Sequence, residues 1–278
     1  MSGAFLTADG LTLVYDDQPG EGTPLLCLAG LTRSALDFEH FAAEMAGRRV
    51  IRLDARGRGR SDHSENWRSY DIVTEASDAV ALMDHLGLDR AVIVGSSRGG
   101  YQAMVIAATA RERIAGVVLN DVGPELSPKG LAKIMDYLGL PPKARTYVEA
   151  AETFRAEGDF DAPFEWFLDW ARRTYRGEDG ALELSYDARL RDAIIEQAAA
   201  LDPDGPGLWP LFDALSGLPL LLLRAENSNL LSAEAAQRMA DRRADMAVAV
   251  ISGRGHIPRL DQPECLKAIK EFLNDHSL

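Results

Sequence analysis

A serine between two glycines stands where the chain changes from a strand pattern to a helical one. Residues 94–100 read V-G-S-S-R-G-G, so Gly95, Ser97 and Gly99 form a G-x-S-x-G pattern. An apolar run typical of a buried strand precedes it, and a helical pattern begins at Arg98. Glycines let the chain turn sharply, and the amides at a helix N-terminus favour a developing negative charge. The pattern therefore predicts Ser97 as a nucleophile at a strand-to-helix turn.

A serine nucleophile needs a base within hydrogen-bond reach, and histidine is the usual one. Among the five histidines, His256 follows a predicted strand and lies in a loop, where its ring can meet a serine from elsewhere in the chain. His256 is therefore a candidate for the base. No role is assigned to the other histidines: His40, His63, His85 and His276.

Three further segments accompany the serine motif. Residues 28–31 read L-A-G-L, residues 54–62 read D-A-R-G-R-G-R-S-D, and residues 255–264 read G-H-I-P-R-L-D-Q-P-E. Together with residues 94–100, they resemble the ordered motifs of the α/β-hydrolase family: its H-G-x oxyanion loop, its D-x-R-G-x-G-x-S-D loop, its nucleophile turn and its catalytic histidine segment. The resemblance covers nearly the whole chain and implies the serine-nucleophile branch of that family.

The resemblance also implies where a negatively charged oxygen would be stabilised. The backbone N–H groups of Leu31 and Arg98 take the places of the family's two donors. Ala29 stands at the usual histidine of this loop, which leaves the backbone donors intact. The implied chemistry is acyl transfer, in which Ser97 attacks a carbonyl, His256 takes its proton, and water then releases the acyl group.

The residue that would orient the histidine departs from the family pattern. The family places an Asp or Glu after the strand that follows its lid, and the corresponding residue here is Asn229. An amide cannot stabilise an imidazolium by charge, and the Asp-to-Asn exchange in a serine protease lowers kcat about 10⁴-fold. Asp121, which closes the strand beside the nucleophile strand, is the alternative acid, and Glu226 is a weaker one. Because residues 226–231 closely resemble a family segment with Asp at this position, we expect Asn229 to occupy the place of the acid.

Strand and helix patterns alternate along most of the chain, which predicts a parallel sheet with helices on both faces. Residues 11–15 alternate polar and apolar side chains and predict an antiparallel edge strand. Between residues 124 and 215 the strand patterns stop and helical ones take over. By resemblance we expect an α/β-hydrolase fold with a mostly parallel eight-stranded sheet flanked by helices. Its core would comprise residues 1–123 and 216–278, and residues 124–215 would form an all-helical lid.

The lid would decide the substrate. Trp166 and Trp170 lie in it at helical spacing and contact either the substrate or the lid's own core. Arg33 and Arg98 flank the oxyanion loop and the serine turn, which would suit an anionic acyl group. The expected function is hydrolysis of a small-molecule carboxylic ester or lactone. The alternatives are a C–C bond hydrolase of ring-cleavage products, and a ligand-binding protein whose turnover Asn229 has impaired.

The charge balance limits the partners of the chain. It has 30 Lys and Arg against 43 Asp and Glu, for a formal net charge of −13. Such a chain is poorly suited to a phosphate backbone and is repelled by anionic lipid. We expect a small-molecule substrate, no nucleic-acid or membrane partner, and a monomer or homodimer in the cytoplasm, since the N-terminus has no signal-peptide pattern. The two cysteines are far apart, and no metal or organic cofactor is expected.

Overall fold

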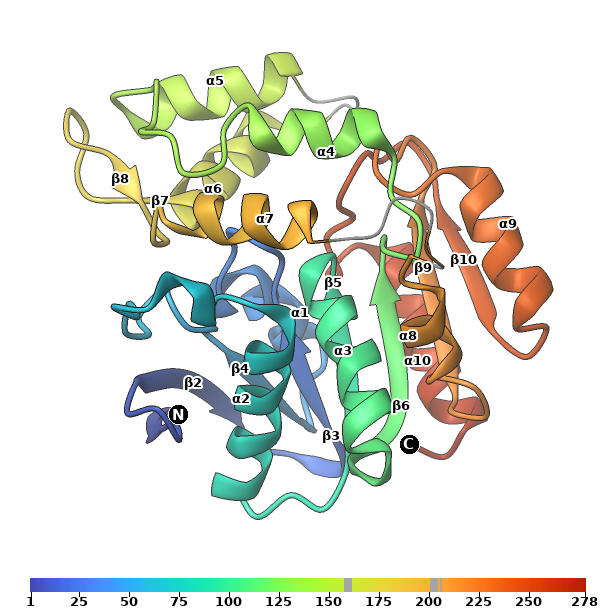
Figure 1. Cartoon of the computed structure of the whole chain (residues 1–278). Helices are drawn as coiled ribbons and strands as arrows, with labels where there is room; N and C mark the ends of the chain where they lie inside the picture. Colours follow the sequence, from blue (N-terminus) through green and yellow to red (C-terminus); the bar gives the residue numbers. More distant parts are fainter. Residues whose placement is uncertain (158–161, 201–204, 206) are drawn as a thin grey trace.

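The apolar runs of the sequence form the centre of an eight-stranded sheet (Figure 1). A computed structural model describes residues 1–157, 162–200, 205 and 207–278. Across the sheet the strand order is β1-β2-β4-β3-β5-β6-β9-β10. The strands are β1 (Ser2–Leu6), β2 (Thr12–Gln18), β3 (Glu21–Leu28), β4 (Arg48–Leu53), β5 (Ala91–Ser96), β6 (Ile114–Asn120), β9 (Leu220–Ala225) and β10 (Ala247–Ile251).

The sheet is mostly parallel, as predicted. Strand β2 pairs antiparallel with both β1 and β4, and the other neighbouring strands pair in parallel. The prediction that residues 11–15 form an edge strand was wrong, because β1 adds a further strand outside β2. Phe5 of β1 pairs opposite Leu13 of β2, and both side chains are buried in the same apolar cluster. This burial holds the N-terminal segment on the sheet.

Helices cover both faces of the sheet. Because side chains alternate along a strand, Leu26 and Leu28 of β3 face one layer while Leu25 and Cys27 face the other. The first layer contains α2, α3, α8 and α9, and the second contains α1 and α10. No helix in the described ranges is long and apolar enough to cross a membrane. The helices are α1 (Glu39–Glu44), α2 (Ile72–His85), α3 (Arg98–Thr109), α4 (Pro128–Met135), α5 (Tyr147–Glu157), α6 (Phe164–Thr174), α7 (Leu190–Ala199), α8 (Trp209–Asp213), α9 (Ala233–Arg242) and α10 (Pro263–Asp275), with 3-10 turns η1 (Ala35–Phe38), η2 (Trp67–Ser69) and η3 (Arg111–Arg113).

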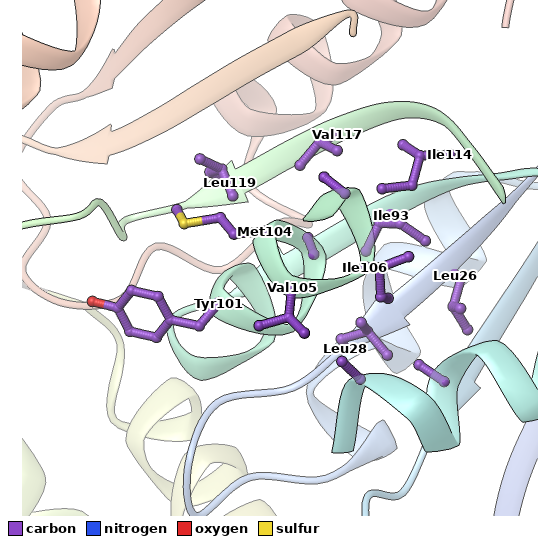
Figure 2. Packing of buried hydrophobic residues seen from close by; sticks show 14 of the residues in the cluster. Leu26, Leu28, Ile93, Tyr101, Met104, Val105, Ile106, Ile114, Val117 and Leu119 are labelled. Carbon is purple, nitrogen blue, oxygen red and sulfur yellow. The ribbon is translucent and has the colours of Figure 1, made fainter. Parts of the chain in front are cut away.

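Helix α3, which follows the serine motif, is held firmly against the sheet. Figure 2 shows its residues Met104, Val105 and Ile106 among strand residues such as Ile93 and Leu119. All five side chains are buried. Burying an aliphatic side chain of this size stabilises the fold by about 1.5–3 kcal/mol. The buried contacts of α3 therefore hold its first residues in a fixed position.

The chain between β6 and β9 leaves the sheet to form a separate helical layer. Helices α4, α5, α6 and α7 lie over the end of the sheet toward which the β6 arrow points (Figure 1). This layer has an apolar centre of its own, made by Ala150 and Ala151 of α5 with Phe167 and Ala171 of α6. Since the carboxyl ends of parallel strands commonly carry the site in α/β folds, the layer covers the place where a ligand would bind.

The prediction that residues 124–215 are all helical was wrong. Strands β7 (Tyr175–Arg176) and β8 (Glu183–Leu184) pair as a short antiparallel hairpin. Gly177 and Gly180 make its turn possible, because their φ angles of +97° and +96° suit glycine. At the end of the segment, Phe212 of α8 and Leu215 are buried in the core cluster that contains α3. Residues from α8 onward therefore pack as part of the core.

Candidate active site

Ser97 occupies a strained turn between β5 and α3. Its φ of +49° lies in the left-handed region, which costs a non-glycine residue about 1–3 kcal/mol. Two backbone hydrogen bonds hold the turn: Ser97 N donates to Asn120 O at 3.0 Å, and Gly100 N donates to Ser97 O at 2.9 Å. The Ser97 side chain is partly exposed and points from a fixed backbone, as a nucleophile must.

The glycines on either side of Ser97 are required by close packing. A Cβ on Gly99 would lie 2.0 Å from the carbonyl oxygen of Leu28, and one on Gly95 would lie 2.5 Å from backbone atoms of Gly99 and Gly100. Real Cβ atoms do not approach backbone so closely. The sharp turn thus brings β3, β5 and α3 together with no room for side chains at these two positions.

The loop after β3 lies beside the serine. A Cβ placed on Gly30 would lie 3.8 Å from Ser97 Cβ. Arg33 N donates to Gly30 O at 3.1 Å, which fixes the peptide between Gly30 and Leu31. In a trans peptide the N–H points opposite to the C=O, so the Leu31 N–H points away from this hydrogen bond. Arg98 is the first residue of α3, and its N–H has no acceptor within the helix.

His256 is held by Asp121. The two atoms His256 Nδ1 and Asp121 Oδ2 are 2.7 Å apart, which is a strong hydrogen-bond distance. The Asp121 side chain is fully buried, while 17% of the His256 side chain is exposed. Because Nδ1 is engaged by the carboxylate, Nε2 is the nitrogen left to exchange a proton with another group.

The Asp121 carboxylate is fully occupied by donors. Its Oδ1 accepts from Ala225 N at 3.0 Å, and its Oδ2 accepts from Ser228 Oγ at 2.7 Å as well as contacting His256. The backbone of Asp121 also takes a positive φ of +54° at the end of β6. Such strain in a buried and multiply bonded residue is typical of functional sites.

The expectation that Asn229 occupies the place of the acid is corrected by this geometry. Asn229 is exposed, and the neighbouring Ser228 is the residue whose side chain reaches Asp121. Glu226, the weaker alternative, is also exposed, and its carboxylate accepts from Gly253 N at 2.7 Å. The segment after β9 therefore supplies a hydroxyl to the site, while the carboxylate comes from the end of β6.

The two arginines expected near an anionic substrate are both engaged by carboxylates. Arg33 Nε and Nη2 donate to Asp37 at 2.7 and 2.6 Å, and its Nη1 contacts Thr174 Oγ1 of α6. Arg98 Nε donates to Glu75 at 2.7 Å. The Arg98 side chain is buried and points toward α2, so only its backbone N–H remains near Ser97.

The tryptophans of the helical layer pack with its aromatic side chains. The rings of Trp166 and Trp170 are 5.2 Å apart between centroids, and Trp170 lies 4.8 Å from Phe154. The Arg259 guanidinium lies 5.4 Å from the Trp166 ring centroid. Both tryptophans are partly buried and pack against the apolar centre of the layer, and their contact with a substrate stays a prediction.

Helix α6 is tied to both loops of the site. Asp169 Oδ2 accepts from Arg259 Nη1 at 2.9 Å, and Arg259 lies three residues after His256. Thr174 contacts Arg33 near the loop after β3. Burial alone would raise the pKa of Asp169, but the hydrogen bond and charge of Arg173 outweigh it and hold the pKa below its ordinary value. The ionised Asp169 therefore joins the helical layer to the histidine loop.

Asn120 was missed by the sequence reading. Its Nδ2 donates to Ser96 Oγ and to Pro258 O, both at 3.0 Å, and its backbone oxygen accepts from Ser97 N. It thus joins the nucleophile turn to the histidine loop. A signal was available, since Asn120 and Asp121 are polar residues that close an otherwise apolar strand.

Two surface cavities, each of about 390 Å³, lie away from this constellation. Neither cavity is lined by Ser97 or His256. Within the described ranges no three His, Cys, Asp or Glu side chains come together as metal ligands would. The first cavity is lined in part by Asp9, Arg56, Asn66 and Asp78, and the second in part by His63, Pro141, Arg176 and Tyr186.

Comparison with known proteins assigns the family. The family model described as alpha/beta hydrolase fold matches residues 23–263. The chain is an α/β hydrolase. It is 32% identical over 266 residues to 3-hydroxybutyrate-oligomer hydrolase of Cupriavidus necator, covering 91% of this chain and 89% of that protein.

Two further relatives agree with this assignment. The hydrolase is 28% identical to 2-(acetamidomethylene)succinate hydrolase of Mesorhizobium japonicum over 92% of this chain and 90% of that protein. A crystal structure of an α/β hydrolase from Novosphingobium aromaticivorans is similar to it with a TM-score of 0.91 and 37% identity, covering 99% of this chain and 98% of that one. The fold predicted from the four motifs is thus confirmed.

Proposed function

We propose that this hydrolase cleaves a carboxylic ester or lactone of a small molecule through an acyl-enzyme on Ser97. The observation that carries the proposal is the 2.7 Å contact of His256 Nδ1 with the buried Asp121 carboxylate. A carboxylate in this position holds the imidazole in the tautomer that can accept a proton at Nε2, and it stabilises the imidazolium that forms. With Asp121 present, the replacement at Asn229 no longer argues for a protein without turnover.

The proposed reaction uses these groups in turn. Ser97 Oγ attacks the substrate carbonyl while His256 Nε2 takes its proton. The carbonyl oxygen gains negative charge and accepts hydrogen bonds from the N–H groups of Leu31 and Arg98. His256 then gives the proton to the leaving alcohol, and the acyl group stays on Ser97. A water molecule, deprotonated by the same imidazole, releases the acid and restores the serine.

In structures without substrate, the hydrogen bond between a nucleophile and its base is often long, and it shortens when substrate binds. No hydrogen bond joins Ser97 Oγ to a group in the part of the chain that the structure describes. We infer that the helical layer of α4 to α7 acts as a lid over Ser97, so that substrate entering beneath it completes the contact between Ser97 and His256. Exclusion of water under such a lid strengthens each hydrogen bond to the oxyanion.

The relatives support a choice of first substrates. Since one of them is named for the hydrolysis of 3-hydroxybutyrate oligomers, we propose short esters of hydroxy acids as the acyl class to try first. The panel should contain the 3-hydroxybutyrate dimer, a p-nitrophenyl butyrate, a γ-lactone and a β-diketone. If the β-diketone is cleaved in preference to the esters, the proposed function becomes C–C bond hydrolysis by the same residues.

The test of the mechanism is labelling and turnover in Ser97→Ala. A fluorophosphonate probe should label the wild-type protein at Ser97, and Ser97→Ala should neither be labelled nor turn over an ester. The melting temperature should stay within a few degrees, because the side chain is partly exposed and Ser97 Oγ makes no hydrogen bond among the residues that the structure describes. The neighbouring variant Ser96→Ala is the control and should still be labelled. Ester turnover by Ser97→Ala at the wild-type rate would refute the proposed mechanism.

A further inference from the structure

A buried ionic cluster lies directly behind the two amides assigned to the oxyanion. Its centre is Glu75 of α2, whose side chain has no exposed surface. Glu75 Oε1 accepts from Arg58 Nη1 and Glu75 Oε2 accepts from Arg98 Nε, each at 2.7 Å. Gln102 Nε2 adds a third donor to Oε2 at 3.0 Å. Burial alone would raise the pKa of Glu75, but the charges of Arg58 and Arg98 outweigh it and hold the pKa below its ordinary value.

One arm of the cluster reaches the loop after β3. Arg58 Nε donates to Leu31 O at 2.9 Å, while Nη1 of the same guanidinium is bound to Glu75. This hydrogen bond fixes the peptide that follows Leu31, and the bond from Arg33 N to Gly30 O fixes the peptide that precedes it. Both sides of Leu31 are therefore held, so the direction of its N–H is set.

The other arm reaches the start of α3. Arg98 donates through Nε to Glu75 and through Nη2 to Tyr70 O at 2.9 Å. Its side chain is 9% exposed. Arg98 follows the strained Ser97, and its own N–H is the second amide of the proposed oxyanion site. Anchoring its side chain holds the first turn of α3 in place against the strain of the serine turn.

We propose that Glu75 is a positioning residue that sets the spacing of the two oxyanion donors. One carboxylate binds both the arginine that holds Leu31 and the arginine that supplies the second N–H. The two amides are 67 residues apart in the chain, one in the loop after β3 and one at the start of α3, and the cluster joins these segments through buried charge-assisted hydrogen bonds. Such donors must meet the oxyanion at about 2.7–3.1 Å, so a small loss of alignment weakens the transition state more than the bound substrate. The inference rests on the proposed acyl-enzyme mechanism.

The decisive variant is Arg58→Lys. A lysine can keep a charge beside Glu75, but it has no donor at the position of Nε and so loses the bond to Leu31 O. The matched control is Arg56→Lys. Arg56 is equally buried, at 1% exposure, and its guanidinium binds Asp78 at 2.6 and 2.7 Å. Among the described residues, its side-chain hydrogen bonds go to Asp78 and Asp9 and none goes to the loop after β3.

Three measurements separate positioning from stability. They are the kcat and KM for an ester, the melting temperature, and inhibition by an alkyl trifluoromethyl ketone. The ketone carbonyl accepts the Ser97 oxygen and becomes a hemiketal whose negatively charged oxygen needs the two amides. We expect Arg58→Lys to lower kcat about 10- to 100-fold, less than the 10²- to 10³-fold cost of removing one donor outright. KM should change less than about threefold, and inhibition by the ketone should weaken in parallel with kcat.

The control defines the outcome that would overturn the inference. Arg56→Lys should lower the melting temperature as much as Arg58→Lys does, while its kcat and ketone inhibition stay within about threefold of wild type. Equal effects of the two variants on kcat and on the ketone would show that the cluster only stabilises the fold. Glu75→Gln is the second test, and it should lower kcat and weaken the ketone together at temperatures where it is folded.

Failure of this inference can be told from failure of the proposed function. Suppose that the fluorophosphonate labels Ser97 and that the wild type hydrolyses esters, but that Arg58→Lys behaves as Arg56→Lys does. Then only the proposed role of the cluster is refuted. If Ser97 is not labelled and Ser97→Ala remains active, the mechanism on which the cluster would act is lost.

Discussion

At the scale of single residues, the proposed mechanism depends on which side chain is the partner of His256. The structure places the Asp121 carboxylate at 2.7 Å from the ring and leaves Asn229 exposed. Ser228, adjacent to Asn229, donates to the same carboxylate oxygen as His256. The segment after β9 therefore supports the acid instead of supplying it, which explains how an amide is tolerated at Asn229.

This geometry predicts opposite results for two conservative exchanges. Asp121→Asn should lower kcat by up to about 10⁴-fold, because an amide removes the charge and favours the wrong imidazole tautomer. Asn229→Asp should change kcat less than about twofold, because its side chain faces solvent. Steady-state kinetics with one ester and the melting temperature of each variant give the measurement. A large gain of activity in Asn229→Asp, with little loss in Asp121→Asn, would reverse the assignment of the acid.

At the scale of elements, the site depends on how closely β3, β5 and α3 approach one another. Gly99 is the point of contact, since a Cβ there would lie 2.0 Å from Leu28 O. The neighbouring atom belongs to backbone that is paired on both sides within the sheet, so it cannot move aside. Gly99 is therefore required so that α3 can pack closely against β3, and this packing in turn fixes the turn at Ser97.

Gly99→Ala should therefore prevent folding or destabilise the protein by more than the roughly 1–3 kcal/mol typical of an inserted methyl group. The control is Gly47→Ala, at a glycine with a φ of +91° and no atom within 4 Å of an added Cβ. That variant should lose only the cost of the left-handed backbone, about 1–2 kcal/mol. Denaturant unfolding of both variants gives the comparison. A Gly99→Ala protein as stable as Gly47→Ala would mean that the elements can separate.

At the scale of the whole molecule, the stability of the fold at low pH should depend on the buried cluster around Glu75. The pKa of Glu75 lies below its ordinary value of 4.5 in the folded protein. A carboxyl group with a lowered pKa contributes its full stability above the unfolded pKa, and the contribution is lost as the pH falls through the folded pKa. The cluster should thus stabilise the hydrolase at neutral pH and fail in acid.

We expect the difference in melting temperature between the wild type and Glu75→Gln to depend on pH. At about pH 7 the wild type should melt at a higher temperature than Glu75→Gln. This difference in melting temperature should narrow as the pH falls below the ordinary pKa of 4.5 and through the lowered pKa of folded Glu75, where the protonated side chain becomes equivalent to an uncharged amide. Glu271→Gln, on the exposed surface of α10, is the control and should show a small gap throughout. A gap for Glu75→Gln that does not change with pH would show that the charge of Glu75 does not support the fold.

The sequence alone predicted the fold, which is confirmed, and the proposed nucleophile Ser97 and base His256, because these predictions depend on short-range constraints. The turn at Ser97 is specified by glycines two residues away on each side and by the strand and helix that flank it. His256 lies in a segment whose ten residues carry a recognisable motif. The alternation of strands and helices then predicts the parallel sheet, since successive strands need a helix to return.

Tertiary structure decided which carboxylate lies beside His256 and the direction of the arginine side chains. Asp121 and His256 are 135 residues apart, and their meeting depends on how far the loops at the carboxyl ends of β6, β9 and β10 extend. The resemblance of one segment favoured Asn229, but a motif does not say which way a side chain turns. Likewise, Arg98 was expected to face a substrate, whereas the buried carboxylate of Glu75 draws its side chain toward α2. Long-range electrostatic partners are chosen by the packing of helices and strands, and their identity cannot be read from local spacing.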